Sequence, residues 1–240
     1  MKFEDIKKLH QKKFRAELGH FLVEGEHLVQ ELQKAALHDA RLRHSEIYLT
    51  RDFAHWSSPL PIHVIQSRQM AQISETRAPQ GIAAVVPLFK AAAPHANQRV
   101  VYLHEIQDPG NLGTILRTLA WFGNFRCLLG PDSVDMHNGK VVRASMGAIF
   151  HVPVEVDVPL ASLAGRFSRI ACLDLKGEAI ASPEFRNFDC YLFGNEARGL
   201  PRGVIEARAF TIPGTNAIES LNVAATVNIC LYEINRPAIL

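Results

Sequence analysis

Residues 108–117 read DPGNLGTILR and stand between a strand-like apolar run and a helix-like one. Two further polar segments have similar settings, FGNEARGLP at 193–201 and IPGTNAIESLNV at 212–223. In an open α/β sheet, loops of this kind gather at the carboxyl ends of the strands, where ligands bind. The three segments therefore predict a polar site at one edge of a sheet, above a largely apolar slot for a cofactor.

The chain around these segments alternates between two kinds of apolar pattern. Short apolar runs predict strands at 100–106, 125–129, 152–156, 169–173, 191–194 and 210–213. Helical spacing of apolar residues predicts helices at 112–122, 140–148, 160–167 and 221–235. Strands that alternate with helices favour a mostly parallel sheet covered on both faces, so we expect an α/β fold here.

The N-terminal part of the chain predicts a smaller α/β domain. Helical spacing before and after a strand-like stretch at 21–25 is followed by short strand-like runs at 46–50, 62–65 and 81–86. Residues 87–97 then contain two prolines and three consecutive alanines, with few bulky apolar side chains, which is typical of a linker. We therefore predict a first domain at 1–90, a linker at 91–98 and a second domain at 99–240.

Bulk composition narrows the class of protein. Of 240 residues, 48% are hydrophobic and 21% are charged, which fits a globular rather than a disordered chain. A net charge of +2 does not by itself indicate a nucleic-acid partner. Basic residues nevertheless crowd the first positions and fit either a phosphate-binding patch or a solvated helix face. They are Lys2, Lys7, Lys8, Lys12, Lys13 and Arg15.

The same composition argues against a metal site and a membrane segment. The four cysteines are widely spaced and form no C-x-x-C pair, so neither a disulfide framework nor a zinc site is expected. His104, His137 and His151 are interpreted as ordinary polar contacts. No apolar stretch approaches the roughly 20 residues that span a bilayer, and the N-terminus lacks the apolar core of a signal peptide. We therefore expect a cytoplasmic protein without a metal or a membrane partner.

The first polar segment combines a flexible turn with two polar side chains. Gly110 and Gly113 bracket Asn111 where a strand gives way to a helix, so the backbone can turn sharply and approach a ligand. Arg117 lies one helical turn after Gly113 and faces the same side. A plain turn, with Asn111 as a helix cap and Arg117 on the surface, fits the same residues. Neither G-x-G-x-x-G nor G-x-x-x-x-G-K-[ST] occurs, so dinucleotide and P-loop sites are not indicated.

The other two segments add further polar candidates. Gly194 and Gly199 enclose Glu196, which suits a backbone wrapped closely around a flat ligand or, alternatively, a surface turn. In the third segment, Ser220 fits the N-cap of the long final helix. Asn222 falls in the first turn of that apolar helix, where it requires a polar partner.

The three segments, in this order and with these spacings, resemble the signature motifs of the SpoU/TrmH-type RNA ribose 2′-O-methyltransferases of the SPOUT superfamily. KVVRASMGA at 140–148 also resembles the stretch that these proteins carry between the first two motifs. The resemblance covers residues 98–236. Residues 3–86, with FLVEG at 21–25, more loosely resemble the small L30e-like substrate-binding domain that precedes the catalytic domain in many relatives.

The resemblance implies a deep trefoil knot in the C-terminal sheet, S-adenosylmethionine as cofactor and a homodimer that completes the site. The residues that would contact the cofactor are Gly194, Ile212 and Leu221. The residues that would line the reaction site, without a metal, are Asn111, Arg117, Glu196, Ser220 and Asn222. The third motif of the family has a Met and a Gly where this chain has Gly214 and Asn216, so this loop departs from the family pattern.

Methyl transfer to a ribose 2′-hydroxyl requires alignment of the oxygen with the donor and loss of a proton. Arginine stays protonated, so Arg117 is predicted to bind a neighbouring phosphate, and the base is left open. The predicted function is S-adenosylmethionine-dependent 2′-O-methylation of folded RNA, with ribosomal RNA as the first choice. A tRNA methyltransferase and a non-catalytic RNA-binding or assembly factor of the same fold are the alternatives.

Overall fold

The computed structural model describes residues 1–89, 98–215 and 217–236, and these form two units. The first unit contains Met1–Lys90 and Asp135–His151, and the second contains Ala91–Val134 and Val152–Leu240. Residues 135–151 thus pack with the N-terminal part of the chain, although they follow the first motif in sequence. The predicted linker at 91–98 lies outside the described residues, apart from Gln98.

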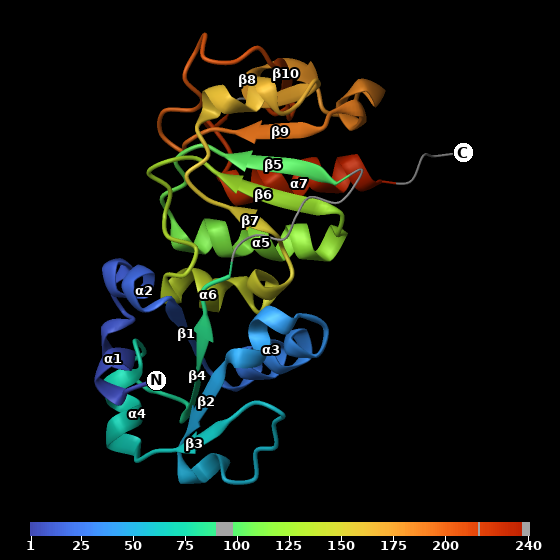
Figure 1. Ribbon diagram of the computed structural model, residues 1–240. Helices are drawn as coiled ribbons and strands as arrows, with labels where there is room; N and C mark the ends of the chain where they lie inside the picture. Colours follow the sequence, from blue (N-terminus) through green and yellow to red (C-terminus); the bar gives the residue numbers. More distant parts are fainter. Residues whose placement is uncertain (90–97, 216, 237–240) are drawn as a thin grey trace. The chain divides into compact units, whose positions relative to one another are not determined.

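The first unit is built on a four-stranded sheet with the order β1-β4-β2-β3. Its strands are β1 (His20–Glu24), β2 (Glu46–Leu49), β3 (Ile62–Val64) and β4 (Ile82–Pro87). Strand β4 is antiparallel to both β1 and β2, whereas β3 runs parallel to β2. The apolar run of β4 is buried on both faces from Ile82 to Val86, because helices cover the two sides of this sheet (Figure 1).

Short helices surround this sheet. They are α1 (Phe3–Lys8), α2 (Lys12–Leu18), α3 (Glu26–His38), α4 (Ser67–Ile73) and α6 (Gly139–Ser145), with 3₁₀ turns at Ala40–His44, Arg51–Phe53 and Ala148–Phe150. Ile6 and Leu9 pack with Met70 and Ile73 in one buried cluster. Helix α3 buries a stripe of apolar side chains, whose spacing along the sequence is that of a helix.

The second unit contains a six-stranded sheet with the order β10-β8-β9-β5-β6-β7. Its strands are β5 (Arg99–Leu103), β6 (Phe125–Leu129), β7 (Val154–Glu155), β8 (Ile170–Ala179), β9 (Cys190–Phe193) and β10 (Arg208–Thr211). All neighbouring strands in it are parallel. The predicted α/β class with a mostly parallel sheet is therefore confirmed, while the knot stays a prediction.

The register of the three central strands decides where their loops begin. Leu103, at the end of β5, pairs with Leu129 of β6 on one side and with Phe193 of β9 on the other. All three strands therefore end at the same edge of the sheet. The chain leaves this edge through the loops that begin at His104, Gly130 and Gly194.

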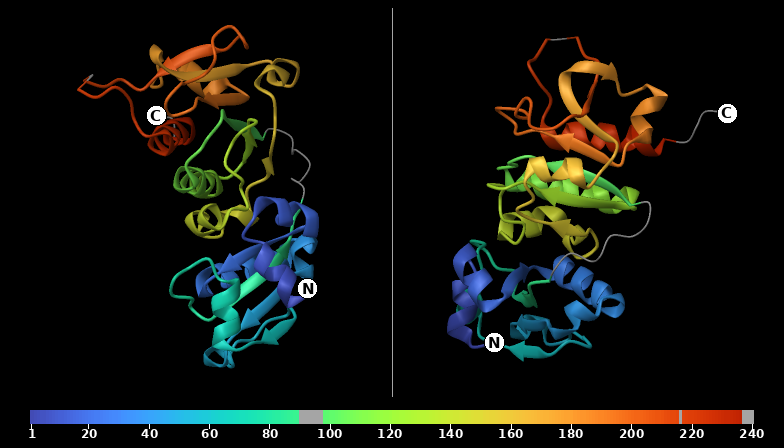
Figure 2. Two further views of the ribbon diagram at one scale, coloured as in Figure 1. Left: turned by 90° about the vertical axis from the view of Figure 1, so that its left-hand side faces the viewer. Right: turned by 45° about the horizontal axis from the view of Figure 1, so that its top comes forward.

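Two long helices of this unit lie side by side against the sheet. They are α5 (Pro109–Phe122) and α7 (Val223–Asn235), which the left-hand view of Figure 2 shows nearly end-on beside one another. The Thr118 hydroxyl donates to Asn228 Oδ1 at 2.5 Å and joins them. The opposite face of the sheet packs against the segment around Leu160 and Leu163, which forms a 3₁₀ helix (Leu160–Gly165) instead of the predicted α-helix. A further 3₁₀ turn spans Pro183–Asn187. Across the described ranges, no helix combines the length and the apolar character needed to span a membrane.

Candidate active site

The first motif forms the turn from β5 into α5, and a helix cap fixes its shape. Asp108 is the N-cap, and its Oδ1 accepts a hydrogen bond from the backbone N–H of Asn111 at 2.7 Å. Pro109 occupies the first helical position, where its missing N–H costs nothing. The capping role that the sequence offered to Asn111 therefore belongs to Asp108. The side chain of Asn111 is available for contacts with other segments.

Asn111 connects the three motifs through its side-chain amide. Its Nδ2 donates to Glu196 Oε1 at 3.1 Å, and its Oδ1 accepts from Asn222 Nδ2 at 2.9 Å. Glu196 and Asn222 lie 85 and 111 positions after Asn111 in the sequence. The structure thus brings three of the five predicted reaction-site residues into one chain of hydrogen bonds.

Asn222 also caps α7, which corrects the expectation for this helix. Its Oδ1 accepts from the backbone N–H groups of Ala224 at 2.9 Å and Ala225 at 3.2 Å. Helix α7 begins at Val223, so Asn222 is the N-cap, a position that the sequence suggested for Ser220. The one side chain therefore satisfies the helix terminus with its oxygen and holds Asn111 with its nitrogen.

The second motif is a tight loop organised by Asn195, a residue that the sequence did not single out. Its side chain is buried, and its Oδ1 accepts from the backbone N–H groups of Ala197 at 3.0 Å and Arg198 at 3.1 Å. Two backbone hydrogen bonds with Gly199 close the loop. A side chain at Gly194 would overlap the backbone of Gly199, which explains why glycine stands there. The glycines on either side of Asn195, Gly194 and Gly199, were the sequence signal that could have identified this residue.

The remaining predicted residues are not joined to this network. Arg117 is exposed on α5, and it makes no hydrogen bond or ion pair with any other residue that the structure describes. Ser220 and Leu221 are exposed, and Ile212 is half-buried, in the segment before α7. Asn216, one of the departures from the family pattern, lies outside the described residues.

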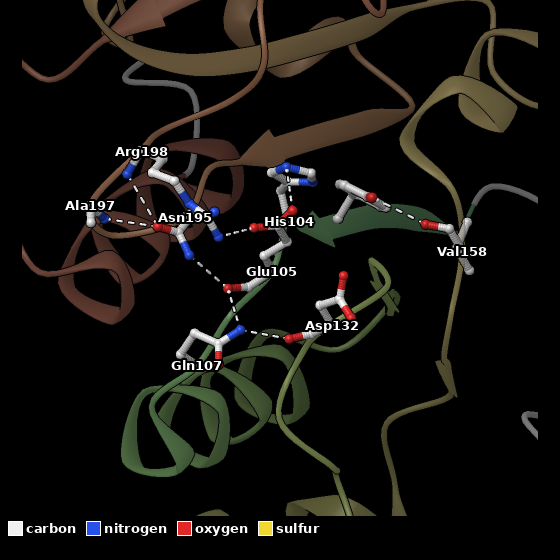
Figure 3. Close-up of polar contacts among 9 residues, drawn as sticks. His104, Glu105, Gln107, Asp132, Val158, Asn195, Ala197 and Arg198 are labelled. Carbon is white, nitrogen blue, oxygen red and sulfur yellow. Dashed lines mark hydrogen bonds and ion pairs between the residues drawn. The ribbon is translucent and has the colours of Figure 1, made fainter.

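The loop after β5 contains a second residue that the sequence did not indicate. Glu105 has a φ of +50°, and its carbonyl oxygen accepts a hydrogen bond from Asn195 Nδ2 at 2.9 Å. Its carboxylate forms an ion pair with Arg198. Gln107 Nε2 donates to the carbonyl of Asp132 at 2.5 Å and so connects this loop to the one that follows β6 (Figure 3). No local sequence pattern encodes these contacts.

Two titratable side chains, Tyr102 and His104, lie near the end of β5 beneath the loops. Burial raises the pKa of Tyr102 to about 12, so its hydroxyl stays protonated and donates to the Val158 carbonyl at 3.1 Å. Nδ1 of His104 is buried and has no partner among the residues that the structure places. Within that same part of the chain, no group of three or more metal-ligating side chains occurs. The polar side chains that connect these loops are amides, the carboxylates of Glu105 and Glu196 and the guanidinium of Arg198.

Two family descriptions match the chain and divide it between them. Residues 98–232 match the SpoU rRNA Methylase family, and residues 2–84 match the MRM3-like substrate binding domain. The chain is 31% identical to 23S rRNA (guanosine(2553)-2'-O)-methyltransferase RlmP of Bacillus subtilis, over 97% of this chain and 95% of that protein. These matches confirm the resemblance that the motifs indicated.

Solved structures agree with this result. A TrmH-family protein from Porphyromonas gingivalis is 28% identical, with a TM-score of 0.83 over 98% of this chain and 96% of that chain. An AdoMet-bound rRNA methyltransferase from Sinorhizobium meliloti has a TM-score of 0.83 at 24% identity, over 98% and 94% of the two chains. The second likeness, at its lower identity, shows the shared fold alone.

Proposed function

The chain belongs to the SpoU rRNA Methylase family, and from that membership we propose that it methylates a ribose 2′-hydroxyl of ribosomal RNA with S-adenosylmethionine as the donor. The observation that carries the proposal is the hydrogen-bonded chain of Asn222, Asn111 and Glu196. Three polar residues from distant segments meet at one edge of a parallel sheet, where α/β proteins bind their ligands. Such an arrangement suits the positioning of a hydroxyl group.

The proposed cofactor site uses backbone and apolar groups. Gly194 allows the second loop to fold tightly against itself, and Leu221 and Ile212 offer apolar side chains in the third motif. An adenosine with a short amino-acid tail fits such surroundings, because its flat base packs on apolar atoms while its polar edges find backbone groups. When bound, the cofactor supplies an activated methyl group.

The residues of the chain would then align the acceptor. Glu196 and Asn222 are fixed through Asn111, so each can hold a ribose hydroxyl at a defined position. Arg117 has a free guanidinium in the described part of the chain, and it suits a phosphate next to the reacting ribose. Ser220, exposed two residues before Asn222, would offer a further hydroxyl contact. The proton acceptor is left open, since arginine does not lose its proton.

The proposal also gives roles to the N-terminal domain and to a second subunit. The domain at 1–90 would bind folded RNA, in line with its match to a substrate-binding domain. A homodimer would form through α5 and α7, which expose large apolar side chains such as Trp121 and Tyr232. The likeness to a bacterial rRNA methyltransferase over 97% of this chain supports the cytoplasm as the proposed location.

Transfer of tritium from labelled S-adenosylmethionine tests this function. The full-length protein is incubated with total RNA from cells that lack it, and the labelled species are separated by size. Label in ribosomal RNA is the expected result. Label in tRNA would overturn the choice of substrate, and tight RNA binding without label would overturn the assignment as an enzyme.

Arg117 provides the matched test of mechanism. Arg117→Ala should lower methyl transfer roughly a hundredfold, because the acceptor is no longer held in line, while calorimetric affinity for the cofactor changes less than about twofold. Arg117→Lys keeps the charge but not the planar fork, so it should retain part of the activity. An equal loss of activity and cofactor affinity in Arg117→Ala would show a structural role instead.

A further inference from the structure

Glu105 has a backbone conformation that is unfavourable for any residue with a side chain. Its φ of +50° lies in the left-handed region, which glycine adopts easily and other residues rarely do. Strain of this kind persists where surrounding contacts require it, and it is concentrated at functional sites. The contacts of Glu105 therefore indicate what its side chain does.

Two of those contacts lead to the loop of the second motif. The Glu105 carbonyl accepts from Asn195 Nδ2 at 2.9 Å, and the carboxylate pairs with Arg198. Asn195 and Arg198 flank Glu196, the residue that accepts a hydrogen bond from Asn111. Figure 3 shows Asn195 between Glu105 and the backbone of Ala197 and Arg198. Glu105 thus holds the loop on both sides of Glu196.

We propose that Glu105 is a positioning residue, which uses its carboxylate to fix the Gly194–Leu200 loop in the conformation that receives S-adenosylmethionine. The inference rests on the proposed function and deepens it. The backbone carbonyl alone cannot explain a glutamate here, because glycine would supply the same carbonyl with less strain. Only the side chain provides the partner for Arg198, which is otherwise exposed to solvent. Oε1 also lies 3.5 Å from His104 Nε2, so the carboxylate has a second neighbour.

The Glu105→Gly variant distinguishes the effect of the side chain from the effect of the backbone conformation. It removes the carboxylate and relieves the left-handed strain, so the melting temperature should stay equal or rise. Methyl transfer by the full-length enzyme should show a KM for S-adenosylmethionine raised roughly two- to fivefold, as expected for one partly exposed ion pair. At saturating cofactor, kcat should stay within about twofold. A merely structural role would instead lower the melting temperature without this KM-against-kcat split.

Arg198→Gln provides the matched variant on the other side of the pair. It should raise the same KM by a similar factor, and the double variant should be no worse than either single one, because both remove one interaction. An unchanged KM in Glu105→Gly, or additive effects in the double variant, would overturn the inference while the proposed function stands. Failure of the wild-type protein to bind S-adenosylmethionine in calorimetry would overturn the proposed function itself.

Discussion

At the scale of single residues, Asn222 shows how one side chain can serve both stability and the site. Its Oδ1 caps α7, and its Nδ2 donates to Asn111. The two roles need different atoms, so a substitution can remove one of them and leave the other. Aspartate is as good an N-cap as asparagine but has no side-chain N–H.

Asn222→Asp should therefore leave the free energy of unfolding nearly unchanged while it lowers methyl transfer about tenfold or more. An amide flip of Asn111 cannot repair the site, because its oxygen would then face Glu196, a second acceptor. Asn222→Ala should lose the cap as well and be destabilised by about 1 kcal/mol. Urea unfolding and tritium transfer on both variants measure the two effects. Full activity of Asn222→Asp would show that the Asn111 contact is dispensable.

His137 is a second residue whose surroundings lead to a measurable effect. The pKa of His137 is lowered to about 4, mainly by burial; the Asp135 carboxylate opposes this shift and the Arg15 cation adds to it. The centroid of the His137 ring lies 4.6 Å from the centroid of the Phe21 ring. Because the ordinary pKa is 6.5, unfolded chains bind this proton at a higher pH than the folded protein does. The contribution to stability is fully present above pH 6.5 and is lost as the pH falls towards 4.

From that pKa we expect the free energy of unfolding to fall by about 3 kcal/mol between pH 6.5 and pH 4 on account of His137. His137→Gln should flatten the pH dependence in this window, as followed by urea unfolding at fixed ionic strength. His27→Gln, at an exposed position on α3, is the matched control and should leave the dependence as it is. An identical slope in His137→Gln and wild type would contradict the prediction.

The meeting of Asn111, Glu196 and Asn222 could be predicted from the sequence, because loops at the ends of parallel strands share one edge. The role of Glu105 could not be predicted. It depends on a single backbone angle and on the register between β5 and β9, and neither leaves a trace in local composition. The same limit applies to Asn222 as N-cap, since Ser220 has an equally good side chain for that position.

At the scale of elements, apolar sequence patterns predicted the helices and strands that bury a continuous run of side chains. They did not predict elements that bury only a few. Strands β6 and β9 and helix α5 were predicted within a few residues, because each is an uninterrupted buried run or stripe. Helix α4 was not predicted, since it buries only Met70 and Ile73. Strand β8 extends beyond its predicted end at residue 173 to Ala179 through exposed residues, which give no apolar signal.

Helices α5 and α7 carry the prediction that belongs to this scale. If two subunits pair through these helices, a charge at Tyr232, which is 59% exposed, should dissociate them, because an ionised carboxylate is costly to bury. Tyr232→Glu is expected to sediment as a monomer and to lose methyl transfer. Leu37→Glu on α3 changes an equally exposed apolar residue, at 62%, and should remain a dimer. A wild-type protein that is already monomeric would refute the pairing.

At the scale of the whole molecule, residues 135–151 belong to a unit that their place in the sequence did not suggest. Helix α6 packs against β1, and its Val141 and Val142 are fully buried. Arg15, only 5% exposed, binds Asp135 through Nε at 3.0 Å and Nη2 at 2.5 Å. Periodicity identified α6 as an amphipathic helix, but it could not name the surface that covers it.

Deletion of residues 1–90 should therefore do more than weaken RNA binding. It removes β1 and Arg15, which leaves the apolar face of α6 uncovered and Asp135 without its cation. In hydrogen exchange of the remaining fragment, amides of 139–150 should exchange rapidly, while those of β5, β6 and β9 stay protected by their own sheet.

Arg15→Ala in the full chain isolates the ionic part of this effect. It should lower the free energy of unfolding by about 3 kcal/mol, because the partly buried Asp135 carboxylate loses its cation. Arg15→Ala combined with Asp135→Ala should cost less than Arg15→Ala alone, since no uncompensated charge then remains. If amides 139–150 were equally protected with and without residues 1–90, the segment would be held by the second unit instead, and the two-unit division would be wrong at this point.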